Sequence, residues 1–395
     1  MTVKPAQSAK SVLMAPALLM LDDGACFEGN AVGDCTETSG EVVFTTGMCG
    51  YQETLTDPSY YGQIVVFTAA HIGNYGATPK DDEAPAPQSQ KFGAAGVVFH
   101  DLFTLAENSA FPHWRAGSSL NAELAKSGLT GICNIDTRAL TLHLRTHGSR
   151  NGIISALDLD RASLLRRAKA LPSMAGLDLA QKVSCPQMYA FTPKAGDTLP
   201  GGAKKPGQKT LNVAVLDYGA KRSIMLHLLH NDLQPTVWPA KTSAEDILAT
   251  HPDGVMLTNG PGDPAPCTYA IATVQKLIGK VPLFGICLGH QLLGLATGGK
   301  TIKLHFGHHG MNHPVKDSDS GRVLITSQNH GFCVDPATLP PNVRTTHWNL
   351  NDNTLEGIAL TDAPAFSVQF HPEATPGTWD ACGLFEKFRK LIEDF

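Results

Sequence analysis

The second half of the chain alternates strand-like and helix-like segments, and this alternation limits the fold more than any other feature. Apolar runs at 213–219 and 282–287 are typical of strands that are buried on both faces. Helical segments follow them at 221–231 and 288–296. Because a strand followed by a covering helix returns the chain to a parallel neighbour, the pattern predicts an α/β fold with a mainly parallel sheet flanked by helices.

The length of 395 residues is more than one compact domain usually holds. Residues 195–210 are rich in Gly, Pro and Lys without an apolar period, which is typical of a linker. We expect a flexible extension over 1–16, an N-terminal α+β domain over 17–194 and a second domain over 211–395. In the first domain, β-type runs come first (18–21, 41–45, 63–69 and 95–99) and helical segments later (119–127, 137–146 and 162–170).

Charge and cysteine usage exclude several classes of protein. The net charge of -5 gives no dense positive face, so we expect no nucleic-acid or membrane partner. The apolar runs are too short to cross a bilayer. Nine cysteines, an odd number without a CxxC pair, favour a reducing cytoplasm over a disulfide framework.

A cysteine stands where one of the predicted strands meets its helix. Gly285-Ile286-Cys287-Leu288-Gly289 has the spacing of a nucleophile elbow, with Cys in place of Ser. The glycines let strand and helix pass closely at a sharp turn, and the helix dipole favours the thiolate. The Leu288 N–H is placed to receive an oxyanion. The sequence therefore predicts that Cys287 is a nucleophile and not a buried structural cysteine.

A base for this nucleophile follows a late apolar run. His371 comes directly after 365–370, and Glu373 comes two residues later. Residues i and i+2 of an extended segment share a face, so Glu373 can align the imidazole or stabilise its charged form. We predict a catalytic triad of Cys287, His371 and Glu373.

GICLGHQ and the downstream HPE resemble the class I (triad) glutamine amidotransferases. Further motifs resemble the carbamoyl-phosphate synthase small subunit family. These are DYGAKRSI, LTNGPGDPAPC, FGHHGMNHPVKD and SQNHGFCV after the linker, and GEVVFTTGMCGYQETLTDPSYYGQIVVFTAAHIGNYG before it. The resemblance runs from about Ala17 to the C-terminus, and its N-terminal part has no counterpart in other triad amidotransferases.

This resemblance implies a reaction and a partner. Cys287 would attack the side-chain amide of L-glutamine to form a γ-glutamyl thioester, and His371 would protonate the departing ammonia and then activate water. A separate large synthase subunit would use the ammonia, bicarbonate and ATP to make carbamoyl phosphate for arginine and pyrimidine synthesis. We expect ATP and Mg on that partner, no cofactor in this chain, and a heterodimer or a higher oligomer.

The resemblance also implies which residues bind glutamine. They are Gly47, Gly260, Gly262, Leu288, Gln291, Asn329, Gly331 and Phe332. Gly47 departs from a common pattern of the family, since some members carry Ser there, and only a backbone contact remains possible. Cys49 stands where Thr is usual, which we interpret as a small neutral replacement and not as a second nucleophile.

Residues 294–301 match the P-loop pattern GxxxxGK[ST]. A working P-loop follows a strand and opens a helix, whereas here a helix comes first and an apolar strand-like run, 301–306, comes after. We interpret the segment as a helix end with Gly298 or Gly299 as its left-handed cap.

Four histidines, His305, His308, His309 and His313, have a spacing that suggests zinc. The glycines among them predict an irregular loop, and no nearby Cys or carboxylate completes a ligand set. We therefore predict no metal and favour loop packing near the active site or contact with a partner subunit.

Two other functions remain open from the sequence. The chain could serve a different synthase, of the anthranilate or GMP synthase type, although its N-terminal half argues against this. It could also be a non-catalytic scaffold or regulatory subunit, although the intact Cys287, His371 and Glu373 argue against that.

Overall fold

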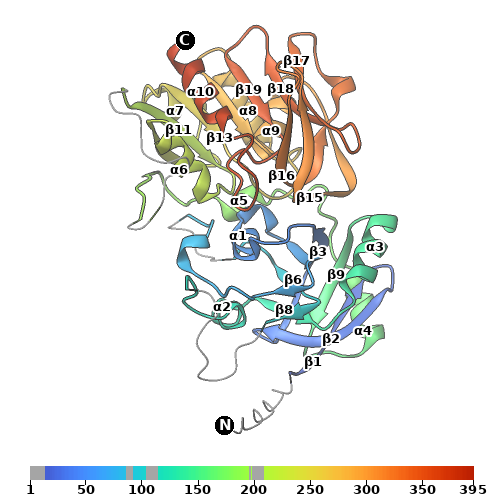
Figure 1. Ribbon diagram of the computed structural model, residues 1–395. Helices are drawn as coiled ribbons and strands as arrows, with labels where there is room; N and C mark the ends of the chain where they lie inside the picture. The colour runs from blue at the N-terminus through green and yellow to red at the C-terminus, as the bar shows by residue number, and fades with distance from the viewer. Residues whose placement is uncertain (1–13, 86–91, 104–113, 195–196, 198–208) are drawn as a thin grey trace.

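The computed structural model describes residues 14–85, 92–103, 114–194, 197 and 209–395. The chain forms an N-terminal lobe, at the bottom of Figure 1, and a C-terminal lobe, at the top. Most of the predicted linker and most of the predicted N-terminal extension lie outside the described residues.

The N-terminal lobe is built on a closed barrel with the strand order β1-β2-β8-β6-β4-β3-β9. Its strands are β1 (Pro16–Leu21), β2 (Cys26–Gly33), β3 (Glu37–Thr45), β4 (Gln63–Phe67), β6 (Gly96–Val98), β8 (Thr130–Cys133) and β9 (Arg150–Ser155), beside a separate pair, β5 (His71–Ile72) and β7 (Asp101–Leu102). Its helices are α1 (Tyr51–Thr56), α2 (Leu120–Lys126), α3 (Thr137–His147), α4 (Arg161–Lys169) and α5 (Ala180–Val183), with short 3-10 turns at Pro58–Tyr60 and Pro79–Asp81.

The predicted strands and helices of this lobe are confirmed, but the expected order of strands first and helices later is wrong. Strands β8 and β9 follow helices α2 and α3. A run as short as TGIC in β8 has no period of its own, and it is a strand because β2 and β6 pair with its two edges.

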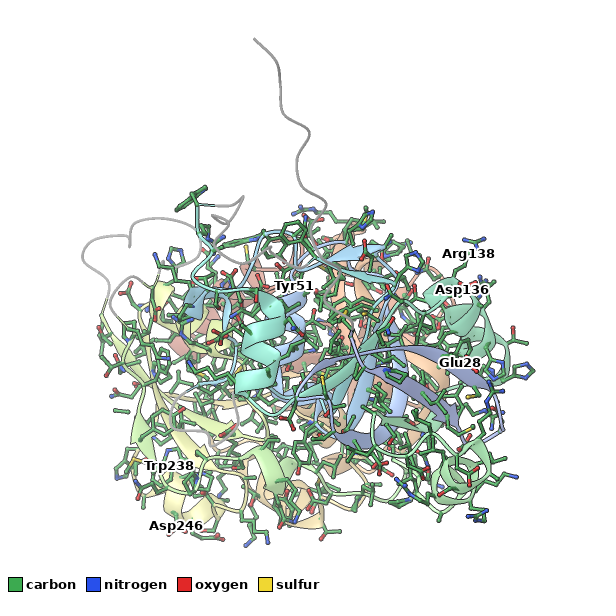
Figure 2. All side chains as sticks on the ribbon, turned by 90° about the horizontal axis from the view of Figure 1, so that it is seen from below. Glu28, Tyr51, Asp136, Arg138, Trp238 and Asp246 are labelled. Atoms are coloured by element: carbon green, nitrogen blue, oxygen red, sulfur yellow. The ribbon has the colours of Figure 1, made fainter. Side chains whose placement is uncertain are left out.

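Helix α3 shows how local sequence sets an element of this lobe. The Asp136 side chain accepts a hydrogen bond from the Ala139 N–H at 2.8 Å and so caps the first turn. Leu140 and Leu144, one turn apart, are buried against the barrel. Figure 2, seen from below, places Asp136 and Arg138 at one edge of the molecule, opposite Trp238 and Asp246 of the C-terminal lobe.

The C-terminal lobe contains a ten-stranded sheet with the order β10-β12-β11-β13-β14-β19-β18-β17-β15-β16. Its strands are β10 (Tyr189–Ala190), β11 (Leu211–Asp217), β12 (Leu233–Pro239), β13 (Gly254–Leu257), β14 (Leu283–Ile286), β15 (Thr301–Asp317), β16 (Val323–Val334), β17 (Val343–Asn349), β18 (Leu355–Leu360) and β19 (Ala365–Val368). The strands from β12 to β19 in this order are parallel, as predicted, and the other pairs are antiparallel.

Helices cover both faces of the parallel part of this sheet. They are α6 (Arg222–His230), α7 (Ala244–Leu248), α8 (Thr268–Leu277), α9 (Leu288–Ala296) and α10 (Gly383–Glu393), with a 3-10 turn at Pro336–Thr338. On β11, Val213 and Val215 pack in one core with α6 and α10. Ala214 and Leu216 pack in the other core with α7, α8 and α9. Alternate residues of one strand thus serve two cores, which explains its unbroken apolar sequence.

The histidine cluster does not lie in an irregular loop, as the sequence analysis expected. The predicted strand at 301–306 continues to Asp317, so the four histidines belong to β15. The pairing of β15 with β16 shifts register twice, between Lys303 and His308 and between Gly310 and His313. The glycines of the cluster lie at these shifts, within a paired strand. Local sequence therefore suggested a loop where long-range pairing makes a strand.

The P-loop-like segment is a helix end, as predicted. Helix α9 ends at Ala296, Gly298 has the left-handed φ of 98°, and β15 begins at Thr301. Among the described residues, no helix has the length and apolar character needed to cross a membrane.

The predicted domain bounds remain a prediction. Strand β10, which they assign to the N-terminal domain, pairs with β12 of the C-terminal sheet. Cys185 and Phe191 also lie in a C-terminal core. These contacts favour a boundary earlier than residue 194.

Candidate active site

The turn between β14 and α9 holds Cys287 in a strained conformation. Its φ is 52° and its ψ is -103°, a combination that a residue with a side chain rarely adopts. A Cβ on Gly285 would lie 2.7 Å from the Gly289 carbonyl oxygen, and one on Gly289 would lie 2.2 Å from the Leu257 carbonyl oxygen. Neither position has room for a side chain, which agrees with the predicted reason for the two glycines.

The Cys287 thiol is buried, with 2% of the residue exposed. Its Sγ lies 3.5 Å from the Asn329 carbonyl oxygen and 3.7 Å from Gln369 Nε2. In the described part of the chain, no hydrogen bond uses the backbone N–H of Leu288 or Gly260. Gly260 approaches this turn closely, since a Cβ there would lie 2.8 Å from the Leu288 side chain. Two N–H groups that could receive an oxyanion therefore belong to residues next to the thiol, since Leu288 follows Cys287 in the chain and Gly260 lines the same pocket.

His371 and Glu373 meet as the sequence predicts. His371 Nδ1 lies 2.7 Å from Glu373 Oε1, and both side chains are buried. Burial lowers the pKa of His371, but the Glu373 carboxylate and the Cys287 thiol outweigh it and raise the pKa to about 10. His371 Nε2 is buried, and it has no hydrogen-bond partner within the described part of the chain. This ring nitrogen is therefore left to exchange a proton with a group at Cys287.

Lys221 is a member of the site that the sequence analysis missed. Its Nζ lies 3.0 Å from Glu373 Oε1 and donates to the Ala374 carbonyl oxygen at 2.5 Å. Burial raises the pKa of Glu373, but Lys221 and His371 outweigh it and lower the pKa to about 2. The sequence signal for Lys221 was the motif DYGAKRSI, which places this residue just before α6. The motif does not show which residues the Lys221 side chain contacts.

A pocket opens beside the Cys287 thiol. It is lined by Glu41, Ser59, Gln63, Met174, Gly260, Pro261, Gly262, Cys287, Gln291, Asn329, His330, Gly331 and Phe332. Six of the eight residues predicted to bind glutamine are in this lining. The other two are Leu288, whose N–H is beside the thiol, and Gly47, which lies outside the lining near Met311.

The N-terminal lobe also contributes to the pocket, which the sequence analysis did not predict. Asn329 Nδ2 donates to Asp57 Oδ2 at 3.2 Å, and Asn259 Nδ2 donates to Ser59 Oγ at 2.7 Å. Asp57 is itself held in place because it accepts a hydrogen bond from the Ser59 N–H at 2.8 Å. The pocket therefore lies where the two lobes meet.

Comparison with known proteins matches both halves of the chain to one enzyme. The family model described as "Glutamine amidotransferase class-I" matches residues 214–391. The one described as "Carbamoyl-phosphate synthase small chain, CPSase domain" matches residues 19–154. Three relatives are each named "Carbamoyl phosphate synthase small chain". That of Thioalkalivibrio sulfidiphilus is 49% identical over 96% of this chain and 97% of its own. That of Vibrio cholerae is 51% identical over 96% and 98%, and that of Escherichia coli is 50% identical over 97% and 99%.

Proposed function

This chain belongs to the carbamoyl-phosphate synthase small chains, the glutaminase subunits of that ligase, and from this premise we propose how its residues act. The observation that carries the proposal is the pair formed by Cys287, in a strained backbone turn, and His371, whose Nε2 has no hydrogen-bond partner among the described residues. This arrangement suits attack of a thiolate on an amide, followed by proton transfer from an imidazolium.

In the first step, the Cys287 sulfur attacks the side-chain carbonyl carbon of L-glutamine. The Leu288 and Gly260 N–H groups stabilise the oxyanion that forms. The C–N bond then breaks as His371 Nε2 donates its proton to the departing nitrogen, which leaves as ammonia. The product on the enzyme is a γ-glutamyl thioester.

In the second step, His371 accepts a proton from water, and the hydroxide attacks the thioester carbonyl. The C–S bond breaks, glutamate leaves, and Cys287 is regenerated. Glu373 keeps the imidazolium charged and oriented through Nδ1, and Lys221 holds Glu373 in place.

Glutamine binding follows from the pocket lining. Asn329, Gly331 and Phe332 hold the α-amino and carboxylate groups, while Gly260, Gly262 and Gln291 enclose the side chain. For Gly47 the proposal is limited to a backbone contact.

The ammonia passes to the large synthase subunit, which binds ATP and Mg and makes carbamoyl phosphate for arginine and pyrimidine synthesis. Ammonia that escaped to water at neutral pH would be protonated and lost as a nucleophile, which supports a heterodimer with a sealed path. All nine cysteines are unpaired, which supports a cytoplasmic location.

The test compares glutamate release by the wild-type complex with that by Cys287→Ser. We expect the wild type to release glutamate and to yield a γ-glutamyl adduct on the Cys287 peptide by mass spectrometry, and the variant to do neither. Equal release by both would remove Cys287 from the mechanism. Co-purification with a chorismate- or xanthylate-using enzyme would contradict the assigned partner.

A further inference from the structure

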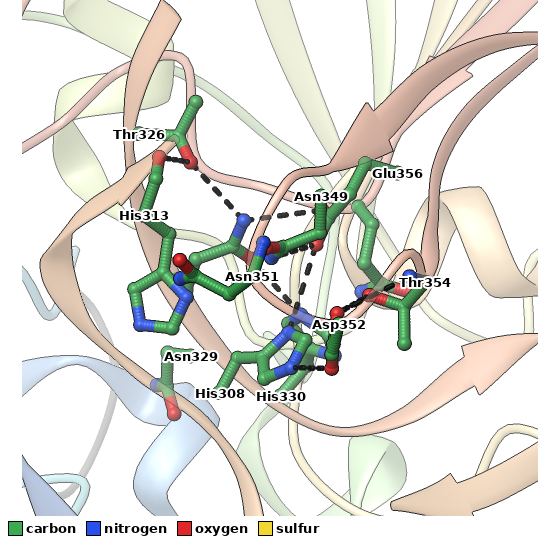
Figure 3. A network of polar contacts seen from close by, with 12 residues as sticks. His308, His313, Thr326, Asn329, His330, Asn349, Asn351, Asp352, Thr354 and Glu356 are labelled. Atoms are coloured by element: carbon green, nitrogen blue, oxygen red, sulfur yellow. Dashed lines mark hydrogen bonds and ion pairs between the residues drawn. The ribbon is translucent and has the colours of Figure 1, made fainter. Parts of the chain in front are cut away.

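Three side chains of types that can ligate a metal converge outside the triad. They are His308 on β15, His330 on β16 and Glu356 on β18, and all three are buried. One potential ligand atom from each lies within 4.8 Å of the other two. Figure 3 shows the group together with the polar residues around it.

The contacts of His308 direct one ring nitrogen into this group. Its Nε2 lies 2.8 Å from Asp352 Oδ2, so the carboxylate holds the proton on Nε2. Its Nδ1 is buried, has no hydrogen-bond partner among the residues that the structure describes, and lies 3.6 Å from Glu356 Oε1. A carboxylate on the far nitrogen is the usual support of a histidine that ligates a metal through the near one.

His330 is oriented in the same way by a backbone carbonyl. Its Nδ1 lies 2.8 Å from the Phe332 carbonyl oxygen, which can only accept a hydrogen bond, so Nδ1 carries the proton. Its Nε2 then presents a lone pair, yet it lies 2.9 Å from Gln328 Oε1, which is also an acceptor. A cation at this nitrogen would satisfy the two facing lone pairs.

Glu356 completes the group with a fully buried carboxylate. Its Oε1 accepts from Asn349 Nδ2 at 2.9 Å, and its Oε2 accepts from Gln328 Nε2 at 3.1 Å. These two amides fix the plane of the carboxylate, as outer-shell partners do in metal sites.

We propose that His308 Nδ1, His330 Nε2 and a Glu356 carboxylate oxygen bind one divalent cation of the Zn²⁺ class. Tetrahedral zinc with bonds of about 2.1 Å places its ligand atoms about 3.4 Å apart, close to the distance between His308 Nδ1 and Glu356 Oε1. Two imidazoles and a carboxylate are ligands that zinc accepts. The expectation of no metal rested on a missing carboxylate, and the β17–β18 hairpin supplies one.

The cation would tie β15, β16 and β18 together behind the pocket wall. His330 stands between Asn329 and Gly331, which line the pocket beside Cys287. The site is therefore structural, and it supports the segment that holds the substrate.

The competing state is a protonated His308 paired with both carboxylates, which binds no metal. Burial lowers the pKa of His308, but Asp352 and Glu356 outweigh it and raise the pKa to about 9. A proton and a cation therefore compete for Nδ1, and a direct binding measurement separates the two states.

The experiment treats the full chain with a chelator and titrates Zn²⁺ by calorimetry. We expect one ion per chain for the wild type and for the surface control Glu245→Gln, and loss of that binding in Glu356→Gln and His308→Gln. If either ligand variant fails to fold, Asp352→Asn, which keeps all three ligands, should bind about 10–100-fold more weakly than the wild type.

Co²⁺ serves as the spectroscopic probe, since ligation by nitrogen and oxygen gives d–d bands without a thiolate charge-transfer band. Three results would overturn the proposal: no Zn²⁺ uptake by the wild type, unchanged uptake by a folded Glu356→Gln, or a thiolate band that Cys287→Ser removes together with all binding.

Discussion

Replacing Glu373 by Gln tests whether a negative charge keeps His371 protonated in the active site. The amide has nearly the size of the carboxylate that lies 2.7 Å from His371 Nδ1, but it carries no charge. With the carboxylate present, the pKa of His371 is about 10 against an ordinary 6.5. That difference corresponds to roughly 4–5 kcal/mol between the two protonation states. Losing the nearby charge should lower the pKa by about 1–3 units.

The assay is the pH profile of kcat/KM for glutamate release by the assembled complex. Because the pKa of His371 is raised, the stability that its charged form adds to the fold is complete below pH 6.5 and is lost as the pH rises through about 10. The imidazolium that protonates the leaving ammonia is lost over the same pH range. The wild-type profile should therefore fall only near pH 10. In Glu373→Gln, the alkaline limb should move down by about 1–3 units, and the maximal rate should fall by about 10²–10⁴-fold.

A second variant separates this electrostatic effect from loss of structure. Glu373→Gln leaves Lys221 buried without its carboxylate, and breaking such a pair costs about 3–5 kcal/mol. Lys221→Met combined with Glu373→Gln removes both charges and should recover much of the lost Tm, while its alkaline limb stays displaced. An alkaline limb at the same pH in wild type and Glu373→Gln would refute the reasoning.

Three further predictions address the elbow and the pocket. In Gly289→Ala the new Cβ would lie 2.2 Å from a backbone oxygen, so thermal denaturation should show a stability about 1–3 kcal/mol lower than that of the wild type. The control Gly331→Ala, where a Cβ would meet open space, should keep the wild-type Tm. Equal Tm values for the two variants would contradict this reasoning. In Gly47→Ser the new Cβ would lie 3.3 Å from the Met311 methyl and 3.6 Å from both the Cys49 carbonyl oxygen and Thr45 Oγ1. The added hydroxyl should lower the KM for glutamine about 2- to 10-fold, and an unchanged KM means that position 47 does not contact glutamine. Asp57→Asn replaces an acceptor of the Asn329 amide and should raise the KM for glutamine with little change in kcat. The rise should correspond to a loss of about 1–3 kcal/mol of binding free energy, and a change confined to kcat would count against this role.

The sequence by itself determined the parts of this protein that are local along the chain. The elbow depends on five consecutive residues around Cys287, and the contact of His371 with Glu373 depends on two residues in one extended segment. The parallel part of the sheet could also be predicted, because its apolar runs alternate with helical segments along the chain.

Only the tertiary structure decided which distant side chains join these parts. Barrel closure makes strands of runs as short as β8, which no local period marks. Lys221 reaches Glu373 because β11 and β19 belong to one parallel sheet, and Asp57 reaches Asn329 because the two lobes meet at the pocket. Glu356 reaches His308 because β18 and β15 both flank β17. A carboxylate that is distant in sequence thus sets the chemical environment of a histidine, since charge interactions depend on distance in space and not on separation in sequence.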